Sequence, residues 1–163
     1  MFRYLGRPFS AALRMATMLL SLAACAPSAA PTGGEGPPEA ARAVVREQLE
    51  ALQRNDTPEK DAGIRTAWAR AHPRNRAATG PLGRFTDMLK SPAYRDLLGH
   101  RSHRIALAGG SEVSATFVVT VYTDQGPPLA YRWTVAVIDS GKRSGEWGTT
   151  AVTPPVETGF PPV

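Results

Sequence analysis

The sequence predicts an α+β protein with a single folded domain, in which N-terminal helices pack on a curved antiparallel meander sheet. Two observations predict this class. Apolar residues recur at three- and four-residue spacing between residues 39 and 98, and at two-residue spacing between residues 101 and 152. The first period is typical of amphipathic helices, and the second of strands with one buried face. Helices followed by consecutive strands indicate that the helices cover one face of the sheet.

Four helical segments are expected before the strands. The first begins after Pro38, because proline suits the first turn of a helix, and it runs to residue 54 with one apolar stripe. Thr57 is expected to cap a second helix over residues 58–71, which His72 and Pro73 end. Residues 74–80 (RNRAATG) are expected to be a loop. Residues 81–90 and 92–98 are expected to form a third helix and a short fourth one.

Four strands are expected in the second half of the chain. They cover residues 101–108, 112–124, 129–138 and 146–152, and glycine- or proline-containing turns separate them. Trp68, Trp133 and Trp147 lie at apolar positions of these segments, so all three are expected in the core.

The N-terminus has the pattern of a secretory signal. Residues 1–14 contain three arginines and no acidic residue, and residues 15–24 (MATMLLSLAA) are uncharged and mostly apolar. A helix of about ten residues spans only about 15 Å, whereas the hydrocarbon core of a bilayer is about 30 Å thick. The apolar segment is therefore too short for a stable transmembrane helix.

The end of this segment resembles the lipobox of bacterial lipoproteins, in the residues Leu22, Ala23, Ala24 and Cys25. The resemblance implies that the thiol of Cys25 receives a diacylglyceryl group and that Cys25 becomes the mature N-terminus. Cys25 is the only cysteine of the chain, so an intramolecular disulfide is excluded. Two or more acyl chains hold a protein firmly to a membrane.

The resulting organisation has four parts. Residues 1–24 are the lipoprotein signal peptide, and residues 25–38 are the lipidated cysteine and a disordered tether rich in proline, glycine and alanine. Residues 39–153 form the α+β domain. Residues 154–163 (PPVETGFPPV) are expected to be a disordered tail, because prolines are unsuited to a central strand.

Two stretches of the domain and one late residue resemble a bacterial family known as domain of unknown function 4864. They are residues 44–56 (VVREQLEALQRND), residues 85–98 (FTDMLKSPAYRDLL) and Trp147. The order of elements is also similar, by analogy, to the cone-shaped NTF2-like and cystatin-like folds, which host both enzymes and binding modules. The resemblance implies no catalytic residue.

The charge excludes one class of partner. The chain has 19 Lys and Arg against 14 Asp and Glu, a net charge of +5. Removal of the three arginines of the signal leaves 16 basic residues against the same 14 acidic ones. No broad basic surface remains that would indicate binding to nucleic acid.

No motif indicates catalysis, a metal or a cofactor. The chain has no Gly-x-Ser-x-Gly nucleophile motif and no glycine-rich phosphate loop after a strand, so no catalytic residue is assigned. His100 and His103 are expected to be solvated and to point to opposite faces of the first strand, which excludes a shared metal ion. No cofactor is expected.

Arginines form the one feature that can indicate a ligand. Arg74 and Arg76 lie in the predicted loop, and small side chains surround Arg132 on its strand face. Such a face can be an ordinary solvated surface. It can also be a shallow pocket for a small anionic ligand, over which the loop from Arg74 to Arg76 closes.

The sequence therefore predicts a lipoprotein that is exported and anchored through Cys25 to a bacterial membrane, facing the periplasm or the cell exterior. Its domain is expected to be a binding or interaction module, with a protein or a small anionic ligand as the partner. The alternative is an envelope enzyme, or a small-anion-binding protein, that uses a pocket in the cone-shaped fold.

Overall fold

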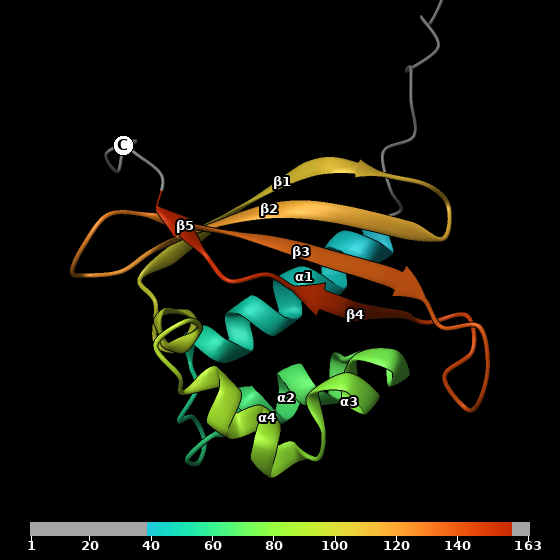
Figure 1. The fold of residues 1–163 in the computed structure, drawn as a ribbon, viewed down its shortest axis with the longest axis horizontal. Helices are drawn as coiled ribbons and strands as arrows, with labels where there is room; N and C mark the ends of the chain where they lie inside the picture. Colours follow the sequence, from blue (N-terminus) through green and yellow to red (C-terminus); the bar gives the residue numbers. More distant parts are fainter. Residues whose placement is uncertain (1–38, 158–163) are drawn as a thin grey trace, which may run out of the picture. The chain divides into compact units, whose positions relative to one another are not determined.

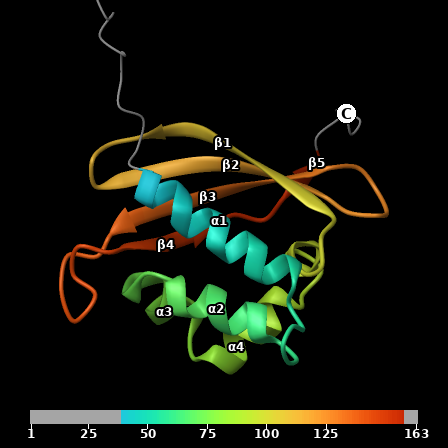
Figure 2. The ribbon, with the colours of Figure 1, turned by 180° about the vertical axis from the view of Figure 1, so that it is seen from behind.

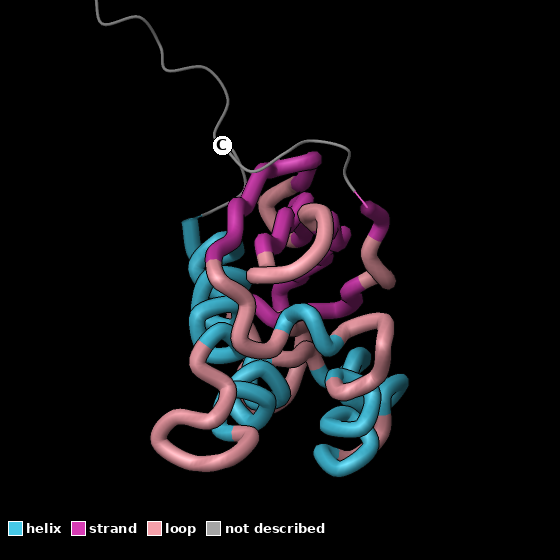
Figure 3. The backbone as a smooth tube through the Cα atoms, turned by 90° about the vertical axis from the view of Figure 1, so that its left-hand side faces the viewer, coloured by secondary structure: helices cyan, strands magenta, loops and turns pink. Residues whose placement is uncertain are grey.

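Four helices form one layer of the structure and an antiparallel sheet forms the other (Figure 1). The computed structural model describes residues 39–157. In the side view of Figure 3 the helices and the strands occupy separate layers. This arrangement confirms the predicted α+β class with its helices on one face of a meander sheet.

The helices are α1 (Glu39–Gln53), α2 (Ala62–Arg70), α3 (Pro73–Thr79) and α4 (Leu82–Leu89). A short 3-10 helix, η1 (Arg95–Leu97), replaces the expected fourth helix. α1 crosses the sheet directly, and α2, α3 and α4 lie beside it on the same side (Figure 2).

The strands are β1 (Ser102–Gly110), β2 (Ser114–Tyr122), β3 (Leu129–Val137), β4 (Trp147–Val152) and β5 (Val156–Glu157). The sheet order is β1-β2-β3-β4, and every strand pair is antiparallel. β5 pairs with the first residues of β3. The sheet is thus a meander, as the two-residue apolar alternation predicts.

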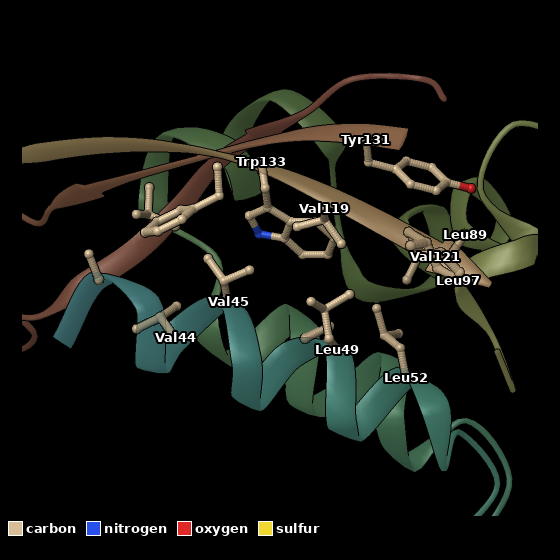
Figure 4. Close-up of a cluster of buried hydrophobic side chains, with 14 of the residues drawn as sticks. Val44, Val45, Leu49, Leu52, Leu89, Leu97, Val119, Val121, Tyr131 and Trp133 are labelled. Atoms are coloured by element: carbon tan, nitrogen blue, oxygen red, sulfur yellow. The ribbon is translucent and has the colours of Figure 1, made fainter. Parts of the chain in front are cut away.

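The core lies between α1 and the inner face of the sheet. Val45, Leu49 and Leu52 of α1 point toward Val119, Tyr131 and Trp133 of the sheet (Figure 4). Each of these side chains is at most 2% exposed. The three- and four-residue spacing of the helix therefore meets the two-residue spacing of the strands across one apolar layer.

Besides the expected fourth helix, two further helix predictions were wrong, and capping by His72 explains the first of them. Residues 74–80 are not a loop: His72 caps α3, its Nδ1 accepting a hydrogen bond from the Arg74 amide at 3.1 Å, and Pro73 takes the first helical position. His72 and Pro73, which were expected only to end the second helix, therefore also begin α3. α2 begins at Ala62, after Asp61, and not at Pro58.

The C-terminal prediction was wrong in part. Residues 154–163 were expected to be a disordered tail, but Val156 and Glu157 form β5 against Ala130 and Leu129. The prolines directly precede this strand, where they remove no ladder hydrogen bond. Residues 158–163 lie outside the described residues, as do the predicted signal, Cys25 and the tether.

The close crossing of α1 and α2 depends on Gly63. A Cβ added to Gly63 would lie 2.1 Å from the carbonyl oxygen of Ala51 in α1. The two backbones meet here without a side chain between them, and the Gly63 amide donates to the Asn55 carbonyl at 2.9 Å. A glycine that weakens α2 by its low helix propensity is therefore required by packing.

We expect Gly63→Ala to lower the free energy of unfolding by about 1–3 kcal/mol, because the new methyl group forces two helix backbones apart. The matched control is Gly83→Ala in α4, where an added Cβ meets no atom within 4 Å. This control should leave stability unchanged or slightly higher. Urea denaturation of both variants measures the difference, and equal effects would contradict the packing role of Gly63.

Candidate functional site

A cavity of about 250 Å³ lies between the helices and the inner face of the sheet. All four helices, η1, β3 and β4 contribute side chains to it. Most of the wall is apolar, with Leu52, Ala67, Phe85, Met88, Leu89 and Leu97 among its residues. Two of the lining residues, Ala78 of α3 and Ala151 of β4, are exposed, so the cavity reaches the surface.

The wall of this cavity carries no charge. None of its lining residues is Asp, Glu, Lys, Arg or His. Transfer of an ion into an apolar site without a partner is very costly. The cavity is therefore suited to neutral, mainly apolar molecules and unsuited to anions.

The polar end of the cavity is a hydrogen-bonded group of Gln48, Trp133 and Thr149. The Trp133 indole donates to Gln48 Oε1 at 3.2 Å and to Thr149 Oγ1 at 3.0 Å. The Thr149 hydroxyl donates to Gln48 Oε1 as well, and Gln48 Nε2 donates to the Ala67 carbonyl at 2.8 Å. All three side chains are 2% exposed. The group is buried and its members satisfy one another, as buried polar atoms require.

Asn75 completes this end of the cavity from α3. Its Nδ2 donates to the Thr149 carbonyl at 3.0 Å, and the His72 amide donates to the same carbonyl at 2.9 Å. Both bonds hold the start of α3 against β4. An isolated parallel bridge between Ala71 and Thr149 continues this contact.

The sequence reasoning missed Gln48, Asn75 and Thr149. One signal was available: Gln48 lies on the apolar stripe of α1, four residues after Val44 and four before Leu52. A polar residue at a core position of an amphipathic helix is informative, because buried polar side chains are uncommon. Nothing local marks Asn75 or Thr149.

Arg76 serves the fold and does not face the cavity. Its Nε donates to the Trp68 carbonyl at 3.0 Å, its Nη2 donates to the Ala69 carbonyl at 2.7 Å, and its guanidinium lies 5.2 Å from the Trp68 ring centroid. Arg143, from the β3–β4 loop, donates to Ala69 and Ala71 carbonyls at 2.8 and 3.2 Å. Two arginines thus cap the C-terminal end of α2, which favours positive charge.

The crowding of these cations has an electrostatic consequence. Burial, and then the positive charge of Arg143, lower the pKa of Arg76 from its ordinary value. The α2 carbonyls compensate by accepting hydrogen bonds from both guanidinium groups.

Arg74 and Arg132 do not converge with Arg76 on one site. Arg74 forms an ion pair with Asp139 at 2.9 Å, and its side chain is 76% exposed. Arg132 is exposed, and its neighbours Tyr131 and Trp133 are buried toward the helices, so it points to the opposite face of the sheet. The sheet therefore separates Arg132 from α3, and the expected closure of a 74–76 loop over Arg132 is not the observed arrangement.

The prediction for His100 and His103 was wrong. His100 is 2% exposed, and its Nε2 lies 2.7 Å from His103 Nδ1. His100 Nδ1 lies 2.9 Å from the Leu97 carbonyl, which can only accept, so His100 carries its proton there and accepts from His103. β1 begins at Ser102, so His100 precedes the strand and the alternation of strand faces does not apply to it.

In the part of the chain that the structure describes, the histidine pair has no third side chain beside it that could bind a metal ion. Among residues 39–157 no group of three or more His, Cys, Asp or Glu side chains can hold a metal ion. Within the same part of the chain, no helix has the length and apolar character needed to cross a membrane.

Comparison with protein-family models, with curated proteins and with solved structures finds no match to this chain. The resemblance to domain of unknown function 4864 and to the lipobox therefore stays a prediction from the sequence. The site must be interpreted from its own chemistry.

The histidine pair makes stability depend on pH. Burial lowers the pKa of both His100 and His103, although Glu50 partly opposes this shift at His103. Below the unfolded pKa of about 6.5 the unfolded chain takes up protons that the native pair does not, so stability falls as the pH falls. The loss is about 1.4 kcal/mol for each unit by which a native pKa is lowered.

We expect the free energy of unfolding to decrease between pH 7.5 and 5 and to decrease less in a His100→Gln, His103→Gln double variant. Chemical denaturation at several pH values measures both slopes. Asp61, whose pKa lies below its ordinary 3.8 chiefly because Lys90 pairs with it, stays ionised in this range. An unchanged slope in the double variant would assign the pH dependence to other groups.

Proposed function

We propose that this protein is a membrane-anchored lipoprotein of a bacterial cell envelope whose α+β domain binds a small, neutral, mainly apolar ligand. The observation that carries the binding function is the uncharged cavity of about 250 Å³ between the helices and the sheet. An apolar cavity of about 150 Å³ in another protein binds benzene, so this cavity has room for a substituted aromatic ring. The anchor is supported by the sequence of residues 22–25.

The polar group at one end of the cavity supports a binding function over a purely structural one. A core that serves stability alone is close-packed, and a void of this size reduces stability. A wall of mostly apolar side chains with a few convergent polar groups is the usual composition of a small-molecule site. The placement of Arg74, Arg76 and Arg132 favours this neutral ligand over the small anion of the sequence prediction.

Filling the cavity tests the binding function. Ala67 in α2 lines the cavity and is 2% exposed. We expect Ala67→Leu to abolish binding of small apolar probes such as toluene while it leaves the free energy of unfolding unchanged or raises it by about 0.5–2 kcal/mol, because the added atoms fill a void.

The matched control is Ala69→Leu, an exposed position on the same helix, which should retain probe binding. Ligand-observed NMR measures binding, and thermal denaturation measures stability. Retained binding in Ala67→Leu, or no binding of any apolar probe by the wild-type chain, would refute the proposed site.

The anchor is tested at Cys25. We expect the wild-type chain, expressed in a bacterial host, to carry lipid on an N-terminal Cys25 and to require detergent for extraction from the membrane. Cys25→Ala should lose the lipid and remain unprocessed or be released, whereas Ser28→Ala should behave as the wild type does. Mass spectrometry of the mature N-terminus provides the measurement, and an unmodified Cys25 or a different N-terminus would contradict the prediction.

A further inference from the structure

The amide of Asn75 has one polar atom that the fold does not use. Asn75 lines the cavity and is 9% exposed. Its Nδ2 donates to the Thr149 carbonyl, which can only accept, and this bond sets the orientation of the amide. Within residues 39–157, Oδ1 of Asn75 accepts no hydrogen bond.

The other polar side chains of the cavity are engaged within the protein. Gln48 Oε1 accepts from both Trp133 and Thr149. The hydroxyl groups of Thr79, Tyr94 and Thr150 donate to the carbonyls of Asn75, Val152 and Thr134, at 2.8, 3.0 and 3.1 Å. These hydroxyl oxygens keep lone pairs that can still accept, but among the described lining residues Oδ1 of Asn75 is the side-chain acceptor that takes part in no hydrogen bond, and it is therefore the first partner for a ligand donor.

The apolar part of the wall favours an aromatic ligand. Phe85, Tyr94 and Trp133 contribute rings to the wall, and Met88 contributes a thioether. Aromatic rings gain energy from ring–ring and sulfur–ring contacts beyond the burial of their area. One water molecule, which occupies about 30 Å³ in the liquid, can pair with Asn75 but leaves most of the cavity unfilled.

We propose that the cavity selects neutral aromatic molecules that carry a hydrogen-bond donor, of the phenol or indole class, and that this donor binds Oδ1 of Asn75. The inference rests on the proposed function, because it specifies the ligand of the same cavity. Asn75 is then the specificity-determining residue, and the uncharged wall excludes the ionised forms of such molecules.

Three probes of similar shape test the role of the donor. p-Cresol has a donor and an acceptor, 4-methylanisole has only an acceptor, and p-xylene has neither. Each is titrated into the full chain, and binding is followed through the Asn75 side-chain amide and Trp133 indole resonances by NMR. Apolar burial alone favours p-xylene, so a preference for p-cresol reports the hydrogen bond.

We expect p-cresol to bind at least about tenfold more tightly than either analogue, a difference of about 1.4 kcal/mol. Asn75→Leu should reverse this order, since it replaces the acceptor with an apolar group of similar size. The control is Thr79→Val, at another polar lining residue whose hydroxyl donates to the Asn75 backbone carbonyl. This variant should keep the preference for p-cresol.

The outcomes separate this inference from the proposed function. If p-xylene binds the wild-type chain as tightly as p-cresol does, the role of Asn75 is overturned while the apolar site stands. If none of the three probes binds, both proposals are overturned. If Asn75→Leu folds and keeps the preference for p-cresol, another residue accepts the donor, and the assignment to Asn75 is wrong. The wild-type comparison decides the preference even if Asn75→Leu does not fold.

Discussion

The side chain of Gln48 connects the two layers of this protein. From its position in α1 it bonds to the Ala67 carbonyl of α2, to the Trp133 indole of β3 and to the Thr149 hydroxyl of β4. Apolar contacts are non-directional and tolerate sliding of a helix over a sheet. A buried side-chain amide tolerates much less sliding, because its polar atoms are satisfied only when their partners lie at hydrogen-bond distance. Gln48 therefore restrains the relative positions of α1, α2 and the sheet, in addition to the close backbone contact at Gly63.

The same group of residues determines where the cavity lies. Gln48 and Trp133 hold the sheet against α1, while His72 and Asn75 hold α3 against β4 through the Thr149 carbonyl. α4 contributes Phe85 and Leu89 from the far side. The helices are thus held at their ends and crossings, and the space between these attachments is lined by side chains that do not fill it. The cavity therefore lies between the points at which polar contacts join the two layers.

The arginines of the helical layer explain why this site is neutral. Arg76 and Arg143 satisfy carbonyls at the C-terminal end of α2, Arg70 pairs with Glu47 at 2.9 Å, and Arg74 pairs with Asp139. Exposed ion pairs of this kind contribute little stability, but the capping arginines satisfy carbonyls that would otherwise have no partner. The three of these basic residues that cluster in the sequence, Arg70, Arg74 and Arg76, therefore do not form one site, because each caps carbonyl groups or forms an ion pair elsewhere in the fold.

The sequence by itself determined the class of fold and the content of the core, because both depend on local periodicity. The stripe of α1 and the alternation of β2 and β3 identify Val45, Leu49, Val119 and Trp133 as buried without any knowledge of their partners. Where a local signal has two meanings the prediction was wrong: His72 and Pro73 both end α2 and begin α3, and the prolines before Val156 do not prevent an edge strand.

Only the tertiary structure decided which polar residues meet. Gln48 and Thr149 are 101 positions apart in the chain, and Gln48 and Trp133 are 85 apart. The Arg143 guanidinium reaches carbonyls of residues more than 70 positions earlier. No periodic pattern records such a pairing, because hydrogen bonds between distant segments depend on how the layers pack and not on the order of residues within either segment. The cavity, its uncharged wall and the position of Asn75 in that wall all follow from this packing.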